Sequence, residues 1–75
     1  MNKDLNYYMS LPYKTVLTWD EDNEWIAENP ELNGLIGDGA TEEEAIASLR
    51  IMRKLWFMTA LKHNDPIPEP AGVAQ

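Results

Sequence analysis

The residues with the greatest potential for chemistry are carboxylates gathered in the first half of the chain. Positions 20 to 44 hold no Lys or Arg but many acidic residues: Asp20, Glu21, Asp22, Glu24, Glu28, Glu31, Asp38, Glu42, Glu43 and Glu44. Clustered carboxylates can bind a metal ion, act in acid–base pairs, or attract a basic partner. The same charge repels phosphate groups, so we expect no direct nucleic-acid binding.

A metal site is the first alternative to consider. Asp20, Asp22, Glu24 and Glu31 stand at positions 1, 3, 5 and 12 of a would-be EF-hand calcium loop. Position 6, where that loop requires glycine, is Trp25. The residues on either side favour strands, whereas an EF-hand has helices there. The pattern therefore indicates a solvated hairpin turn, and we expect no metal and no cofactor.

Other signatures of catalysis are weak. The chain has no Cys, and its single histidine, His63, has no second ligand or carboxylate partner at a useful spacing. The glycines at 34, 37 and 39 are followed by acidic residues, which do not suit a phosphate-binding loop. We expect no catalytic residues, and we predict that the chain is not an enzyme.

The elements that would position the carboxylates follow from local patterns. Residues 13–19 and 24–28 are rich in β-branched and aromatic types and predict a hairpin, which Asn29 and Pro30 end. Leu35 and Ile36 predict a short third strand, and the glycines after it would allow unusual backbone angles. Thr41 and Glu44 form a capping box, with Glu44 expected to reach back to the Thr41 N–H, at the start of a helix to about residue 62 or 63.

The predicted helix carries two apolar stripes. We expect the first to lie on the sheet: Ala45, Leu49, Met52, Trp56 and Ala60, with Ile46 and Phe57 at its edge. The second stripe, Ile51, Leu55 and Met58, lies on roughly the opposite side, so another surface must cover it. That surface is a second copy of the chain, the N-terminal residues Tyr7 to Leu11, or a foreign partner. We favour self-association into a homodimer or higher oligomer.

The fold class predicted is α+β, in the order β-β-β-α-β. A three-stranded antiparallel sheet and a short C-terminal edge strand over 66–70 would pack on one long helix. Residues 1–12 are expected to be an extended segment, 13–70 the domain, and 71–75 a flexible tail. The N-terminus lacks the apolar run of a signal peptide, and no stretch is long enough to span a bilayer, so we expect a cytoplasmic protein.

Five segments, in this order, resemble HicB-like antitoxins: Tyr7 to Tyr13, Asp20 to Glu28, Pro30 to Ile36, Gly39 to Ala45 and Pro66 to Pro70. The resemblance implies a truncated ribonuclease H-like domain without a nuclease site. It also implies an antitoxin that binds a HicA-type toxin, a small basic ribonuclease, and blocks its active site. Asn33-Gly34-Leu35 stands where the family usually has Pro-Gly-Cys, and the glycine common near Asn23 is absent. Many HicB proteins also carry a C-terminal DNA-binding domain, which is not expected here.

The resemblance and the charge together lead to a hypothesis of charge mimicry, in which carboxylates stand in for RNA phosphates. The partner-binding residues expected are Asp20, Asp22, Glu24, Trp25, Glu28 and Glu31, with Trp25 as the anchor because Trp is enriched at binding hot spots. Trp19, Trp25 and Trp56 could instead all be core residues. There are two alternative functions. One is an orphan HicB-like domain that binds another protein, and the other is a metal-dependent nuclease.

Overall fold

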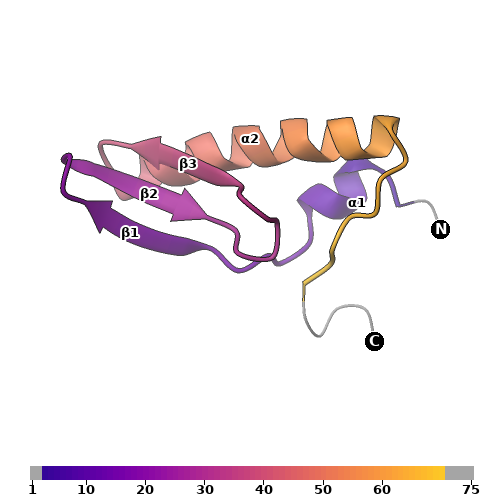
Figure 1. Cartoon of the computed structure of the whole chain (residues 1–75), viewed down its shortest axis with the longest axis horizontal. Helices are drawn as coiled ribbons and strands as arrows, with labels where there is room; N and C mark the ends of the chain where they lie inside the picture. Colours follow the sequence, from indigo (N-terminus) through magenta and orange to yellow (C-terminus); the bar gives the residue numbers. More distant parts are fainter. Residues whose placement is uncertain (1–2, 71–75) are drawn as a thin grey trace.

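The fold is a three-stranded antiparallel sheet with a long helix on one face. The computed structural model describes residues 3–70. The chain forms α1 (Leu5–Met9), β1 (Val16–Asp20), β2 (Glu24–Glu28), β3 (Ile36–Gly39) and α2 (Glu42–Lys62). The strands lie in the order β1-β2-β3, and α2 packs mainly on β3 and β2 (Figure 1). The predicted α+β class, antiparallel sheet and long helix are confirmed.

α2 begins and ends close to the predicted residues. The Thr41 side chain accepts a hydrogen bond from the Glu44 N–H at 3.1 Å, and Glu44 Oε1 accepts one from the Ala40 N–H at 3.1 Å, not from Thr41 as predicted. His63 caps the C-terminus, and Asn64 then turns the chain with a φ of 58°. These caps satisfy backbone groups that the helix itself leaves free.

The close approach of α2 to β3 depends on two glycines. A Cβ on Gly37 would lie 2.2 Å from the Leu49 backbone nitrogen, and one on Gly39 would lie 2.6 Å from the Ala45 nitrogen. Neither residue has a positive φ. The expectation that they supply unusual backbone angles is therefore wrong, and their role is to leave room for the helix.

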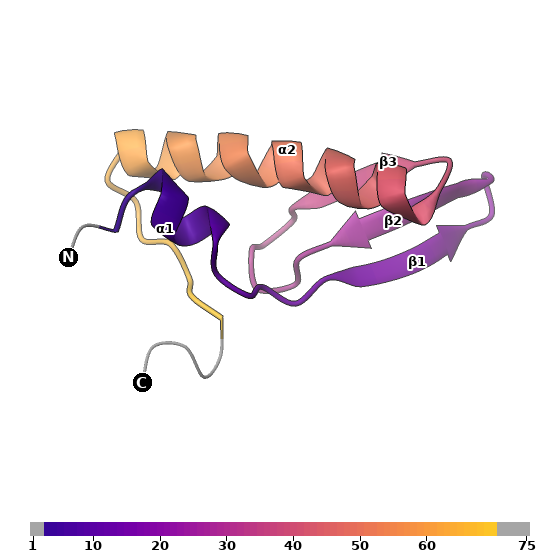
Figure 2. The ribbon, with the colours of Figure 1, turned by 180° about the vertical axis from the view of Figure 1, so that it is seen from behind.

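The helix is rotated relative to the prediction. Phe57, expected at the edge of the stripe, is fully buried, whereas Met52 is 44% exposed. Phe57 lies among aromatic rings, with centroid distances of 5.5 Å to Tyr8 and 5.7 Å to Tyr13. These contacts draw the C-terminal half of α2, which extends past the sheet, toward the N-terminal segment (Figures 1 and 2).

Residues 5–9 form a short helix where we predicted an extended segment. The Asp4 side chain accepts a hydrogen bond from the Tyr7 N–H at 3.0 Å and so caps α1. Tyr8 is buried against α2, and Tyr7 and Met9 pack beside the same core. α1 therefore extends the core under the part of α2 that the sheet does not reach (Figure 2).

The predicted C-terminal edge strand does not form. Residues 65–70 have no regular secondary structure, and side chains hold them instead. The Tyr13 hydroxyl donates to the Pro68 carbonyl at 2.6 Å, and the Glu69 carboxylate accepts from the Tyr7 hydroxyl at 3.1 Å and pairs with Lys3 at 3.0 Å. Three prolines in five residues leave too few N–H groups for strand pairing. The predicted tail, 71–75, lies outside the described residues.

Tyr13 gives this packing a measurable pH dependence. Burial, with the nearby charge of Glu69, raises the pKa of Tyr13 from 10.0 to about 12. The phenol therefore ionises earlier in the unfolded chain, and its contribution to stability is complete below pH 10 and is lost between pH 10 and 12. We expect Tyr13→Phe to cost about 1 kcal/mol at neutral pH, through the lost hydrogen bond.

The measurement is urea denaturation of the wild type and the variant across this pH range. All other ionisable groups are the same in the two proteins, so the difference between their unfolding free energies isolates Tyr13. That difference should narrow and then change sign as the pH rises from 10 to 12, because ionisation of Tyr13 costs the wild type more than the hydrogen bond contributes. A difference that stays constant up to pH 12 would show that Tyr13 does not ionise later in the folded state.

Candidate functional site

The face of the sheet opposite α2 is the main candidate site. Gly37 and Gly39 point toward α2, so their cross-strand partners Ala27 and Trp25 do too. Alternation along each strand then places the other residues on the far side. We call this side the open face; it consists of Val16, Thr18, Asp20, Glu24, Ile26, Glu28, Ile36 and Asp38. α2 packs on the other face, but its Ser48 and Met52 line a hollow with Glu24, Ile26, Ile36 and Asp38 at the β3 edge.

Carboxylates crowd one end of the open face. Asp20 and Glu24 are directly opposite each other in the β1–β2 register, and Asp38 lies diagonally across from Glu24 on β3. Like charges in such positions repel one another. Partial desolvation, followed by the negative charges of Asp38, Asp20 and Asp22, raises the pKa of the Glu24 carboxyl above its usual value. The approach of a cation would relieve this repulsion.

Among residues 3–70, no cation forms a salt bridge at this end of the sheet. Within residues 3–70 the one salt bridge joins Lys3 to Glu69, beside α1. The lysines and arginines of α2 lie on the other side of the sheet, and Arg53 donates to the buried Asn29 side chain at 3.2 Å. The open face therefore presents negative charge that the described part of the chain leaves unpaired.

The structure brings together only some of the predicted partner-binding residues. Asp20, Glu24 and Glu28 lie on the open face, and Asp22 lies in the adjoining turn. Trp25 is on the opposite face, where its ring packs at 5.4 Å from that of Trp19. Glu31 lies at the other end of β1, where its carboxylate accepts from the Lys14 N–H at 2.8 Å. Trp25 and Glu31 therefore do not belong to this surface.

Five residues of this face were not predicted to bind a partner: Val16, Thr18, Ile26, Ile36 and Asp38. Asp38 completes the carboxylate group from β3, and Ile26 and Ile36 supply apolar surface beside it. The alternation in Ile36-Gly37-Asp38-Gly39, with glycine at every second position, was the available signal. The exposed indole near the turn is Trp19, which is 50% exposed, so the three tryptophans do not all belong to the core.

The predicted self-association residues form a second surface on α2. Ile51, Leu55 and Met58 are 62%, 52% and 47% exposed. The alternative that the N-terminal segment covers them is wrong, because α1 packs through Tyr8 against Phe57 on another side of the helix. This stripe has no partner among residues 3–70.

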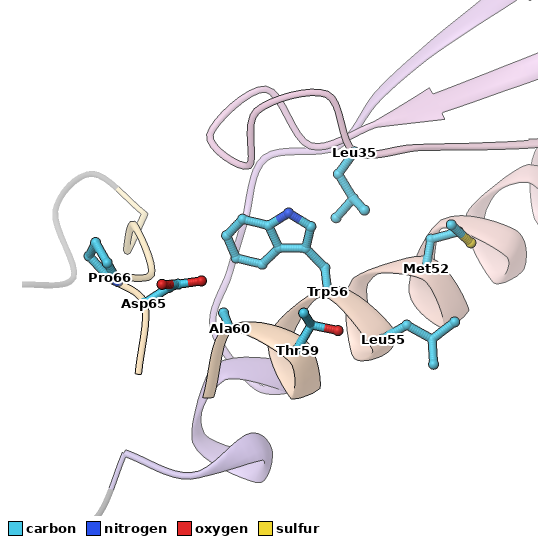
Figure 3. A pocket seen from close by; sticks show the side chains of 8 residues that line it. All are labelled: Leu35, Met52, Leu55, Trp56, Thr59, Ala60, Asp65 and Pro66. Carbon is cyan, nitrogen blue, oxygen red and sulfur yellow. The ribbon is translucent and has the colours of Figure 1, made fainter. Parts of the chain in front are cut away.

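A groove of about 350 Å³ adjoins that stripe at the C-terminal half of α2. Figure 3 shows the Trp56 ring projecting from the helix toward Leu35, with Asp65 and Pro66 at one end and Met52 at the other. Its lining is mainly apolar, and Asp65 is the only ionisable residue in it.

Among residues 3–70, no three His, Cys, Asp or Glu side chains are grouped so that they could hold a metal ion. Neither described helix combines the length and the apolar character needed to cross a bilayer.

Two curated proteins are similar to the chain. UPF0150 protein ssl0259 of Synechocystis is 41% identical over 44 residues, which cover 59% of this chain and 60% of that protein. UPF0150 protein Ta0767 of Thermoplasma acidophilum is 29% identical over 58 residues, which cover 77% of this chain and 84% of that protein. The first match thus spans less than two thirds of its relative. No family model and no solved structure matches the chain.

Proposed function

We propose that this chain is an antitoxin-like protein that neutralises a HicA-type, mRNA-cleaving toxin by direct contact. The observation that carries the proposal is the unpaired group of carboxylates on the open face, Asp20, Glu24 and Asp38. The resemblance to HicB-like antitoxins, described above, gives the class of partner. Similarity to UPF0150 proteins adds relatives but names no partner.

A basic ribonuclease is a suitable partner for this surface. Such an enzyme holds RNA through Lys and Arg contacts to phosphates. Neighbouring strands lie about 4.8 Å apart, so carboxylates on them can bind the cationic groups that otherwise hold the phosphates. Because Asp20, Glu24 and Asp38 repel one another in the free protein, binding a cationic surface relieves an existing cost.

The apolar residues of the open face would add to the contact. Ile36 is 52% exposed, and Ile26 lies diagonally across from it on β2. Burying side chains of this kind contributes roughly 1.5–3 kcal/mol each, more than an exposed ion pair does. In this proposal the carboxylates select a basic partner, and the isoleucines supply much of the affinity.

The experiment is titration calorimetry with a purified HicA-type toxin as the probe. We expect the Kd to rise at least about tenfold between about 50 and about 500 mM NaCl, because salt screens exposed charges. An affinity that does not change with salt would contradict charge mimicry. Failure to bind a HicA-type protein, together with capture of a different one, would favour the orphan-domain alternative.

A further inference from the structure

α2 carries a regular line of side chains on its solvent side. Glu44, Ser48, Ile51, Leu55, Met58 and Lys62 follow one another at spacings of four, three, four, three and four residues. This is the spacing of the contact positions in a coiled coil. We call these six residues the seam. All are exposed except Ser48, which is half-buried. Ile51, Leu55 and Met58 point away from the sheet, whereas Glu44 and Ser48 lie beside β3 at the N-terminal end of the helix.

We infer that the seam pairs with the seam of a second copy in an antiparallel arrangement. The spacings read the same from either end, so reversing one helix keeps every position in register. Ile51 then faces the partner's Leu55, and Ser48 faces the partner's Met58. A two-fold axis through the middle of the seam generates both halves of the interface.

Charge at the two ends selects this direction. The seam begins with Glu44 and ends with Lys62. In the antiparallel pair each Glu44 meets the partner's Lys62, giving two ion pairs, whereas a parallel pair would bring like charges together. One oxygen of Glu44 accepts from the Ala40 N–H, and the other is free to meet the lysine.

This dimer leaves the open face accessible. The apolar part of the seam, Ile51, Leu55 and Met58, points away from the sheet, so its pairing leaves the carboxylates of the open face outside the apolar contact. Ser48 alone borders the open face, because it lines a hollow with Glu24, Ile26, Ile36 and Asp38. The groove at Met52 and Leu55 borders the seam on the β3 side and lies at the edge of the interface. Self-association therefore does not depend on the proposed toxin.

The test is sedimentation of the full chain, whose monomer mass is 8.6 kDa. We expect the wild type to form a dimer, and Leu55→Glu to raise the dimer Kd at least ~100-fold because it places a charge in the apolar centre. Leu55 is already half exposed in the monomer, so circular dichroism of this variant should show an intact fold. A wild type that remains monomeric at millimolar concentration, or a Leu55→Glu variant that dimerises normally, would overturn the inference.

The direction of pairing has its own test. Lys62→Glu should weaken the antiparallel dimer about tenfold, since both ion pairs become repulsive. The double variant Glu44→Lys with Lys62→Glu should restore it. Lys14→Glu, the same change away from the seam, is the matched control and should have no effect. A parallel dimer would instead show neither the loss nor the rescue, and that result would refute the antiparallel arrangement.

Discussion

The Gly37→Ala variant is expected to lose about 3 kcal/mol or more of folding stability, near the upper range for overpacking. The added Cβ would lie 2.2 Å from the Leu49 nitrogen and 2.6 Å from the Leu49 Cα. These are backbone atoms of α2, so no side-chain rotation can relieve the clash and the helix must move off the sheet. A domain of 75 residues has a total stability of roughly 4–11 kcal/mol, so the loss is a large share.

Gly34→Ala is the matched control. Gly34 has a φ of +77° but no atom within 4 Å of the added Cβ, so the substitution introduces backbone strain without a clash. We expect it to cost about 1–2 kcal/mol. Thermal denaturation should therefore rank the wild type first, Gly34→Ala second and Gly37→Ala last. A melting temperature for Gly37→Ala equal to that of Gly34→Ala would show that α2 does not lie this close to β3.

Neutralising the three carboxylates of the open face, Asp20, Glu24 and Asp38, should have the largest effect on binding. The triple variant Asp20→Asn, Glu24→Gln and Asp38→Asn keeps side-chain size and removes three charges from one end of the open face. We expect at least a ~100-fold higher Kd for the HicA-type partner at low salt, because several charge contacts disappear together. The variant itself should fold at least as well as the wild type, since mutual repulsion is removed.

The control for that variant removes the same number of charges elsewhere. Glu42→Gln, Glu43→Gln and Asp65→Asn change exposed carboxylates at the two ends of α2. If both triple variants weaken binding equally, net charge rather than the open face attracts the partner. If only the open-face variant weakens binding, the surface is specific.

Local chemistry predicted the elements that depend on short-range patterns. Thr41 and Glu44 correctly predict the start of α2, and Asn29 and Pro30 correctly predict the end of β2. We did not predict α1, although Asp4 is an ordinary N-cap whose side chain accepts a hydrogen bond from the N–H of Tyr7, three residues later. Helices this short depend on tertiary contacts, here those of Tyr8 with Phe57, which sequence patterns do not show.

The errors at the site have a similar origin. A helical wheel separates the two stripes of α2 but does not show how far the helix is rotated on the sheet, so Met52 and Phe57 were assigned incorrectly. Proximity in sequence suggested that Trp25 and Glu31 belong with Asp20. Strand alternation instead places Trp25 on the other face, and Glu31 lies at the other end of β1, beside Lys14. The β2–β3 register brings Asp38 next to Glu24 from another strand.

RNA cleavage is the most direct measurement of whether the open face neutralises a ribonuclease. A HicA-type toxin at fixed concentration would be mixed with increasing amounts of the wild type, the open-face triple variant or its control. We expect the wild type and the control to stop cleavage at stoichiometric amounts, and the open-face variant to leave it almost unchanged. Equal inhibition by all three proteins would contradict the proposal that these carboxylates take the place of RNA phosphates.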